Sequence, residues 1–114
     1  MKRLNYLKGK KQEAIAQNFL KKKGYKILES NFSTKIGEID IVAKDKNVIV
    51  FVEVKYRTTD GFGLPREAVN GYKQNKIKKV ATLYLKINKL EENDIRFDVI
   101  DILGEDITHI QNAF

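Results

Sequence analysis

The sequence has no cysteine and no tryptophan, and only one histidine and one proline among its 114 residues. Without cysteine the chain can form neither a disulfide nor a thiolate metal site, which fits a reducing compartment. No apolar run is long enough to cross a membrane. No hydrophobic segment follows the basic N-terminus, so we expect no secretory signal. These absences together predict a cytoplasmic protein that is not attached to a membrane.

Length and composition predict one globular domain over residues 1–114. Hydrophobic residues make up 42% and charged residues 32% of the chain, which is ordinary for a soluble domain. This length is enough for a single hydrophobic core.

The net charge of +7 is unevenly distributed along the chain. Residues 1–89 hold 21 of the 22 basic and 8 of the 15 acidic residues, which gives +13. Residues 90–114 hold Arg96 against seven acids, which gives −6. A basic body of this kind suggests a polyanionic partner such as nucleic acid. A solvated, lysine-rich surface explains the charge equally well.

Hydrophobic periodicity predicts an α/β protein in which helices pack on a mixed sheet. We expect helices over residues 7–23 and 72–88, with a helical segment that begins near Arg66 after a loop from Thr58 to Pro65. Strands are expected over residues 25–32, 37–44, 48–57, 94–103 and 108–114. The apolar helix positions expected to face the core are Ala14, Ile15, Ala16, Phe19 and Leu20 in the first helix and Ile77, Val80, Ala81, Tyr84 and Leu85 in the long second one.

The most informative strand is residues 48–57. Its even positions are all valine from Val48 to Val54, which predicts one fully apolar face. Its odd positions begin with Ile49 and Phe51 and continue with three charged residues: Glu53, Lys55 and Arg57. A strand this apolar seldom carries such charges unless they have a function.

The short turn at Lys46-Asn47 predicts that strands 37–44 and 48–57 pair antiparallel. A two-residue loop places Asp40 opposite Glu53 and Glu38 opposite Lys55, and it matches every apolar residue with an apolar partner. Opposed Cβ atoms in such a pair lie roughly 4.5–5.5 Å apart. Two carboxylates that close need a cation or a shared proton, and Mg²⁺ prefers oxygen ligands. The alternative is a solvated sheet end with an ordinary Glu38–Lys55 ion pair.

Such a site contains the groups that phosphodiester hydrolysis requires. Asp40 and Glu53 are the predicted ligands of Mg²⁺ or Mn²⁺. Lys55 lies beside them, where it can position water or stabilise charge on the phosphate.

Asp40, followed across a hairpin by Glu53-x-Lys55, resembles the signature of the PD-(D/E)XK restriction-endonuclease-like superfamily. The chain as a whole resembles the YraN family of small, uncharacterised bacterial proteins. This resemblance spans nearly the full length and rests on Gly9–Ala14, Gly24-Tyr25, Gly37–Asp40, Phe51–Arg57, Lys73-Gln74, Arg96–Asp98 and Asn112–Phe114. One departure is Ile39, which stands where the motif often has proline.

The resemblance implies an αβββαβ core and a Mg²⁺-dependent nuclease acting on DNA. Archaeal Holliday-junction resolvases are also similar, which extends the expected substrates to branched, recombination or repair intermediates. Those resolvases carry an acidic residue on the first helix, a role that falls on Glu13 here as a further catalytic and metal-binding residue. Related nucleases often have a glutamine where Gln74 lies, at the end of the core-facing helical stripe.

Several other residues are candidates for binding or packing roles. Arg57, Lys73 and Lys76 are expected to contact nucleic-acid phosphates, although a solvated surface also explains them. The aromatic residues Tyr56 and Tyr72 can stack on bases or pack at the rim of the core. His109 has no cysteine or histidine partner for a metal and is expected to be structural.

Two functions follow from these observations. The preferred one is the nuclease. The alternative is a non-catalytic nucleic-acid-binding module that acts with a partner protein. Symmetric cutting of two strands would favour a homodimer, although no interface is legible in the sequence.

Overall fold

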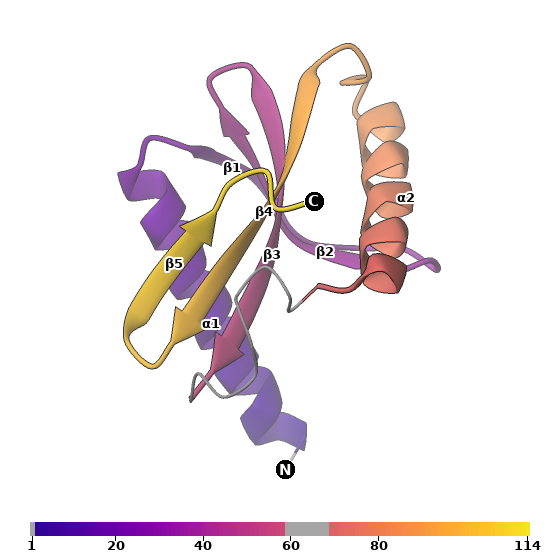
Figure 1. Cartoon of the computed structure of the whole chain (residues 1–114). Helices are drawn as coiled ribbons and strands as arrows, with labels where there is room; N and C mark the ends of the chain where they lie inside the picture. Colours follow the sequence, from indigo (N-terminus) through magenta and orange to yellow (C-terminus); the bar gives the residue numbers. More distant parts are fainter. Residues whose placement is uncertain (1, 59–68) are drawn as a thin grey trace.

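The computed structural model describes residues 2–58 and 69–114, with the side chains of the first helix described from Lys10 onward. The elements run in the order α1 (Lys2–Lys22), β1 (Lys26–Ser33), β2 (Glu38–Asp45), β3 (Val48–Arg57), α2 (Gly71–Ile87), β4 (Asp94–Leu103) and β5 (Asp106–Ile110) (Figure 1). The bounds of β3 and β4 are those expected. Most of the predicted 58–65 loop, and the helical start near Arg66, lie outside the described residues.

The strands form one mixed sheet in the order β1-β2-β3-β4-β5. Neighbouring strands pair antiparallel except β3 and β4, which are parallel. A parallel pair requires a crossover connection, and α2 lies in the segment that joins β3 to β4. The predicted αβββαβ core with a mixed sheet flanked by helices is therefore confirmed.

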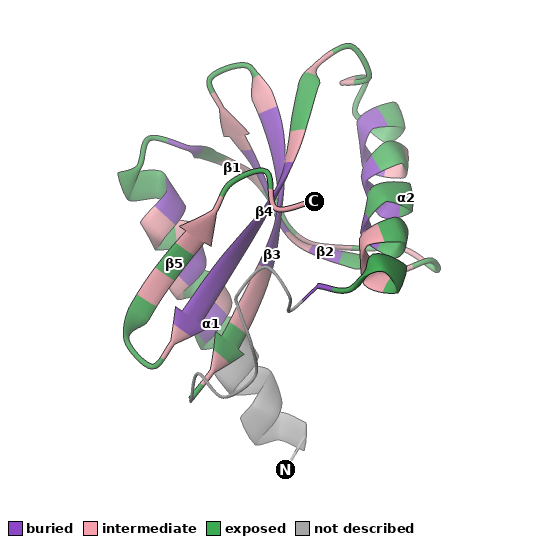
Figure 2. Ribbon diagram, viewed as in Figure 1, coloured by how far each residue is buried: buried purple, intermediate pink, exposed green. Residues whose placement is uncertain are grey.

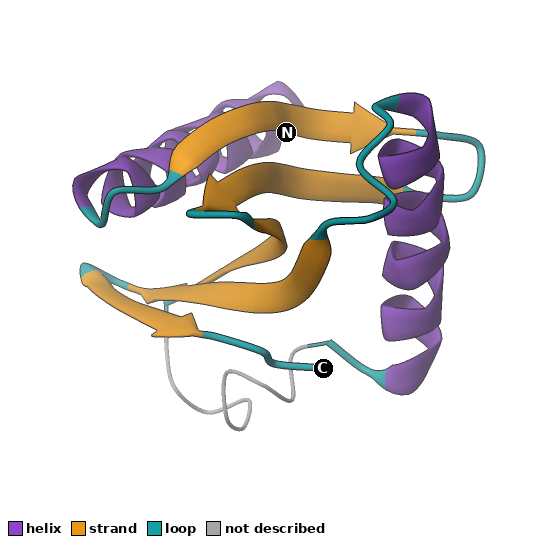
Figure 3. Ribbon diagram, turned by 90° about the horizontal axis from the view of Figure 1, so that it is seen from above, coloured by secondary structure: helices purple, strands orange, loops and turns teal. Residues whose placement is uncertain are grey.

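The alternation of β3 divides the core between the two sheet faces. Val50 and Val52 pack with Ala16 and Leu20 of α1, whereas Phe51 packs with the buried stripe of α2. The two helices lie on different sides of the sheet in Figure 3, and buried residues concentrate in the central strands in Figure 2. All five predicted stripe residues of α2 are buried. Neither α1 nor α2 is long and apolar enough to cross a lipid bilayer, as judged over the described residues.

The predicted stripe of α1 needs one correction. Ala14 is exposed, whereas Ala16 and Leu20 are completely buried. The buried row continues back to Gln12, so it follows the spacing i, i+4, i+8, and Ala14 lies off that row.

The last strand was predicted too late in the chain. β5 ends at Ile110, before most of the expected 108–114 segment. Gly104 adopts a left-handed φ of 62°, and the tight turn there pairs Leu103 with Asp106. The following residues turn back to β4, where the Ala113 N–H donates to the Phe97 carbonyl at 2.7 Å.

The β2–β3 hairpin has the predicted register, with Asp45 opposite Val48 and Ile41 opposite Val52. The pairing ends there, so the predicted pairs Asp40–Glu53 and Glu38–Lys55 do not form and the two strands separate. The Val54 N–H donates at 2.8 Å to a carboxylate oxygen of Asp40, so a side chain takes the place of the next backbone acceptor. β2 meanwhile stays paired with β1 as far as Glu38. The separation of β2 from β3 gives the Asp40 carboxylate its place between the strands.

Candidate active site

A pocket of about 530 Å³ is formed by β2, β3, the β1–β2 turn and the start of α2. Three acids and two lysines line it together with apolar side chains. The charged residues are Glu38, Asp40, Glu53, Lys73 and Lys76. The pocket therefore contains both predicted motif carboxylates, one from each strand of the hairpin.

Carboxylates from α1 and β2 meet beside this pocket. One oxygen each from Glu13, Glu38 and Asp40 lie within 4.8 Å of one another. Oxygen donors gathered this closely match the ligand preference of Mg²⁺ and Mn²⁺. The helix position predicted from the resemblance, Glu13, is therefore brought to Asp40 from a distant part of the sequence.

The predicted ligand set differs from this cluster in one member. Glu38 joins Asp40 and Glu13, whereas Glu53 was expected there. Glu38 and Asp40 are two residues apart on β2, so their side chains leave the same face of the strand. That spacing was visible in the sequence, but Glu38 was assigned as the neighbour of Lys55.

Asp40 is the most strongly perturbed acid at the pocket. Burial raises its pKa to about 7, and repulsion from Glu53 adds to the effect, with smaller contributions from Glu13 and Glu38. The hydrogen bond from Val54 acts in the opposite direction. Near neutral pH this carboxyl group is therefore close to the midpoint of its titration and responds to any nearby cation.

Glu53 is held by lysines from two elements. Its side chain is only 8% exposed, and its Oε1 atom lies 3.1 Å from Lys73 Nζ of α2 and 3.9 Å from Lys55 Nζ of β3. A buried carboxylate needs such compensation. The lysines also affect each other, because burial and a hydrogen bond with Lys73 lower the pKa of Lys55. Burial opposes the charge on Lys73, yet its contacts with Lys55 and Glu53 raise its pKa.

Two predicted residues are engaged elsewhere. The Gln74 side-chain amide donates at 2.9 Å to the Val69 carbonyl before α2, and Gln74 does not line the pocket. Arg57 makes a two-pronged contact with the buried Asp101, with Nε–Oδ1 at 3.1 Å and Nη2–Oδ2 at 3.2 Å. The structure therefore does not bring Gln74 or Arg57 into the pocket.

Lys76, in contrast, lies at the pocket, with its amine 4.7 Å from the ring centroid of Tyr72. The N-terminus of α2 opens onto the same space. Asn70 caps the helix by accepting the Lys73 N–H at 3.0 Å, and the first turn carries no acidic residue. The positive end of the helix dipole therefore reinforces the two lysines on this side of the pocket.

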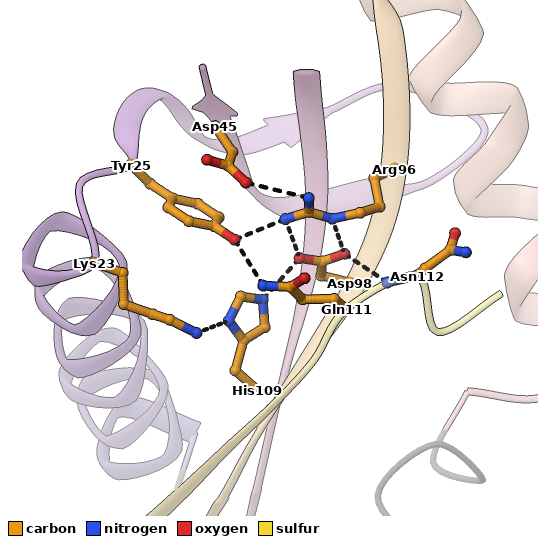
Figure 4. Close-up of polar contacts among 8 residues, drawn as sticks. All are labelled: Lys23, Tyr25, Asp45, Arg96, Asp98, His109, Gln111 and Asn112. Atoms are coloured by element: carbon orange, nitrogen blue, oxygen red, sulfur yellow. Dashed lines mark hydrogen bonds and ion pairs between the residues drawn. The ribbon is translucent and has the colours of Figure 1, made fainter. Parts of the chain in front are cut away.

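A second polar cluster, which the sequence analysis missed, lies under the end of α1 (Figure 4). The fully buried Asp98 accepts from Arg96 Nε at 2.9 Å and from Arg96 Nη2 at 3.0 Å. His109 Nε2 lies 2.7 Å from the same carboxylate, and its Nδ1 lies 2.8 Å from Lys23 Nζ. The Arg96 guanidinium also donates to the Tyr25 hydroxyl at 2.7 Å. None of these residues lines the pocket.

The contacts of this cluster compensate the buried negative charge of Asp98. Burial acts against ionisation of Asp98, but hydrogen bonds from His109, Arg96 and the Asn112 N–H hold the pKa of Asp98 below its usual range. The contacts connect β4, β5 and the end of α1, which agrees with the structural role predicted for His109. Arg96 and Asp98 lie two residues apart on β4, which the sequence could have indicated. The contacts that involve Lys23, Tyr25 and His109 span 11 to 86 residues and leave no local pattern in the sequence.

The αβββαβ core, a five-stranded mixed sheet flanked by two helices, has the restriction-endonuclease-like α/β fold class expected from the sequence. Within that class the chain belongs to the uncharacterised protein family UPF0102, which residues 12–102 match. A UPF0102 protein of Thermodesulfovibrio yellowstonii is 54% identical over 93% of this chain and 94% of its own length. UPF0102 proteins of Caldanaerobacter subterraneus and Clostridioides difficile are 51% and 50% identical, covering 90% and 96% of this chain and 89% and 98% of their own.

Proposed function

We propose that this protein is a Mg²⁺- or Mn²⁺-dependent nuclease that hydrolyses phosphodiester bonds in DNA, with branched, recombination or repair intermediates as its substrates. The observation that carries the proposal is the position of Asp40. Its carboxylate is buried beside three other acids, one of which, Glu53, pairs with two lysines, in a chain of net charge +7. Hydrolysis of a polyanion at a metal site needs this combination of negative ligands and positive surroundings.

The residues present fit a divalent ion. Asp40, Glu38 and Glu13 would hold it, because their oxygens gather within 4.8 Å of one another. Burial first, and then the negative neighbours, raise the pKa of Asp40, and a bound cation would relieve both effects. Glu53 lines the same pocket and is the remaining candidate ligand. When bound, the ion would polarise the phosphate and lower the pKa of a coordinated water.

Lys55 and Lys73 are assigned to the reacting phosphate. Burial and contact with Lys73 lower the pKa of Lys55, which increases the fraction of its amine able to accept a proton from the attacking water. Lys73 retains its proton and can neutralise developing negative charge. Glu53 holds the pair in place from β3.

The exposed lysines of α2 supply electrostatic attraction for the DNA backbone. Lys76 lies at the pocket, and Lys78 and Lys79 follow on the same helix as exposed residues. Cleavage of both strands by one assembly would require a second copy of the site, and therefore a homodimer.

The test combines catalysis and binding. Wild-type protein should cleave one or more of blunt duplex, single-stranded, flap and four-way junction DNA in Mg²⁺ or Mn²⁺, and EDTA should stop it. Asp40→Asn and Glu53→Gln should each lose cleavage while keeping the fold by circular dichroism. Glu29→Gln, an exposed acid on β1, is the matched control and should cleave normally.

A non-catalytic binding module is the second candidate, and one contact favours it. The Lys73 amine lies 3.1 Å from the Glu53 carboxylate and neutralises it. Glu53 therefore has a positive partner even when no metal ion is bound. That candidate predicts salt-sensitive nucleic-acid binding without turnover, and unchanged binding in Glu53→Gln. Cleavage that depends on Glu53 excludes it.

A further inference from the structure

Tyr72 is unusually exposed for an aromatic residue that lines a pocket of charged groups. Its relative exposure is 72%, and it lies in the first turn of α2. The Lys76 amine lies over its ring at 4.7 Å from the centroid. The hydrophobic core does not explain this position, because the buried stripe of the helix begins at Ile77.

The surroundings of Tyr72 combine apolar surface with positive charge. Ile36 of the β1–β2 turn lines the same pocket and is 45% exposed. Lys73 and Lys76 add two amines, and the positive end of the α2 dipole lies at the same pocket. Apolar side chains beside cationic groups match a ligand that is part aromatic ring and part phosphate. A nucleotide has this composition.

The size of the pocket agrees with such a ligand. Its volume of about 530 Å³ falls within the range of roughly 300–1,000 Å³ found for small-molecule sites. A base can stack on Tyr72 only with a free face, which paired bases inside a duplex lack because their neighbours cover both faces. Stacking at this position therefore selects unpaired nucleotides.

We propose that Tyr72 is a stacking platform for an unpaired base, and that the pocket consequently prefers DNA with a single-stranded nucleotide beside the cleaved bond. The inference rests on the proposed function, because it concerns the substrate of that same site. Tyr72 binds the base, and Lys76 supports the stack from the other ring face while contacting backbone phosphate. The carboxylates of the pocket then meet the adjoining phosphodiester.

The experiment measures binding without divalent ions, so that no DNA is cut. Fluorescence anisotropy compares a blunt duplex, the same duplex with a single-stranded flap, and that flap with abasic sites in place of its bases. Wild type should bind the normal flap roughly tenfold more tightly than the abasic flap, since stacking on an aromatic contributes about 1–3 kcal/mol per base. Tyr72→Ala should bind both flaps equally, and Tyr72→Phe should restore the preference.

Ile87→Ala is the matched control, because Ile87 is also strongly exposed on α2 but does not line the pocket. It should behave as wild type. Equal binding of normal and abasic flaps by wild type, or a preference that survives in Tyr72→Ala, would overturn the inference. Cleavage by wild type in Mg²⁺, measured in parallel, separates the two proposals: cleavage without the Tyr72 effect contradicts only the stacking platform, and the Tyr72 effect without cleavage contradicts only the nuclease.

Discussion

Lys73 Nζ lies 3.1 Å from Glu53 Oε1, so a lysine of α2 neutralises a carboxylate of β3 at the pocket. Lys55 Nζ lies 3.9 Å from the same oxygen. This contact connects the helix to the opened hairpin and leaves Asp40 with its acidic neighbours. The charge of Lys73 therefore competes with any cation that the carboxylates attract.

Replacing Lys73 should strengthen divalent-ion binding. In Lys73→Met the competing charge is lost, and we expect about fivefold tighter Mn²⁺ binding, the equivalent of about 1 kcal/mol for a partly exposed ion pair. Isothermal titration calorimetry or the electron paramagnetic resonance signal of free Mn²⁺ measures this affinity. Lys76→Met removes the same charge one turn along α2, where the amine contacts Tyr72. An equal gain in both variants would show that only net charge matters.

Asp40 should make the metal-free protein less stable as pH rises. Its pKa is raised to about 7 in the folded state, so between about pH 4 and pH 7 the folded protein binds a proton that the unfolded chain has released. Stability from this group is therefore present at low pH and lost as pH rises through about 7. Asp40→Asn, which cannot ionise, should be about 2–4 kcal/mol more stable than wild type at pH 8 and similar at pH 4.

Urea unfolding in EDTA across this pH range measures the difference. Asp106→Asn replaces an exposed acid on β5 and should follow wild type. A constant difference between Asp40→Asn and wild type at every pH would contradict the assignment, because it would mean that Asp40 has the same pKa in the folded and unfolded states.

Arg57 should contribute to folding more than to nucleic-acid binding. Its contact partner Asp101 is 2% exposed, and removing one member of a buried pair leaves a buried charge. Arg57→Ala should therefore lower the free energy of unfolding by about 3 kcal/mol. Lys76→Ala should change the free energy of unfolding by no more than about 0.5 kcal/mol. It should weaken DNA binding and make that binding less sensitive to salt concentration. A stable Arg57→Ala protein with weakened DNA binding would instead support the phosphate contact predicted from the sequence.

The Asp98 cluster should stabilise the fold at neutral pH, and this stabilisation should be lost in acid. The pKa of Asp98 is held below its usual range, so its contribution is present above about pH 4 and is lost as pH falls through the folded-state pKa. Asp98→Asn should lose about 3 kcal/mol at pH 7 and show a weaker acid dependence than wild type. Asp94→Asn, an exposed acid of the same strand, is the control in the same denaturation series.

The fold was predictable because its local signals agree with one another. The alternation of apolar residues predicts the register of the β2–β3 hairpin, and extending that register places Asp40 near Glu53. What periodicity could not provide was the separation of the strands beyond the Ile41–Val52 pair. That opening depends on the Asp40 side chain accepting the Val54 N–H, a long-range contact with no pattern in the sequence.

The site was predictable only in part for the same reason. Residues on one strand, such as Glu53 and Lys55, follow from strand geometry. The approach of Glu13 from α1 came from resemblance alone, and the Lys73–Glu53 contact requires the position of a helix relative to the sheet. A phosphate contact was predicted for Arg57 because the sequence of β3 does not indicate that its side chain pairs with Asp101 on the neighbouring strand β4.

The measurement that tests the central claim most directly is a cleavage time course on flap and four-way junction DNA in Mn²⁺, with wild type and Lys55→Ala purified identically. We expect nicks in the wild-type reaction that EDTA abolishes, and a rate at least roughly 100-fold lower in Lys55→Ala, the scale of a lost general base or acid. No product on any substrate, or equal rates in the two proteins, would contradict the assignment of this pocket as a nuclease site.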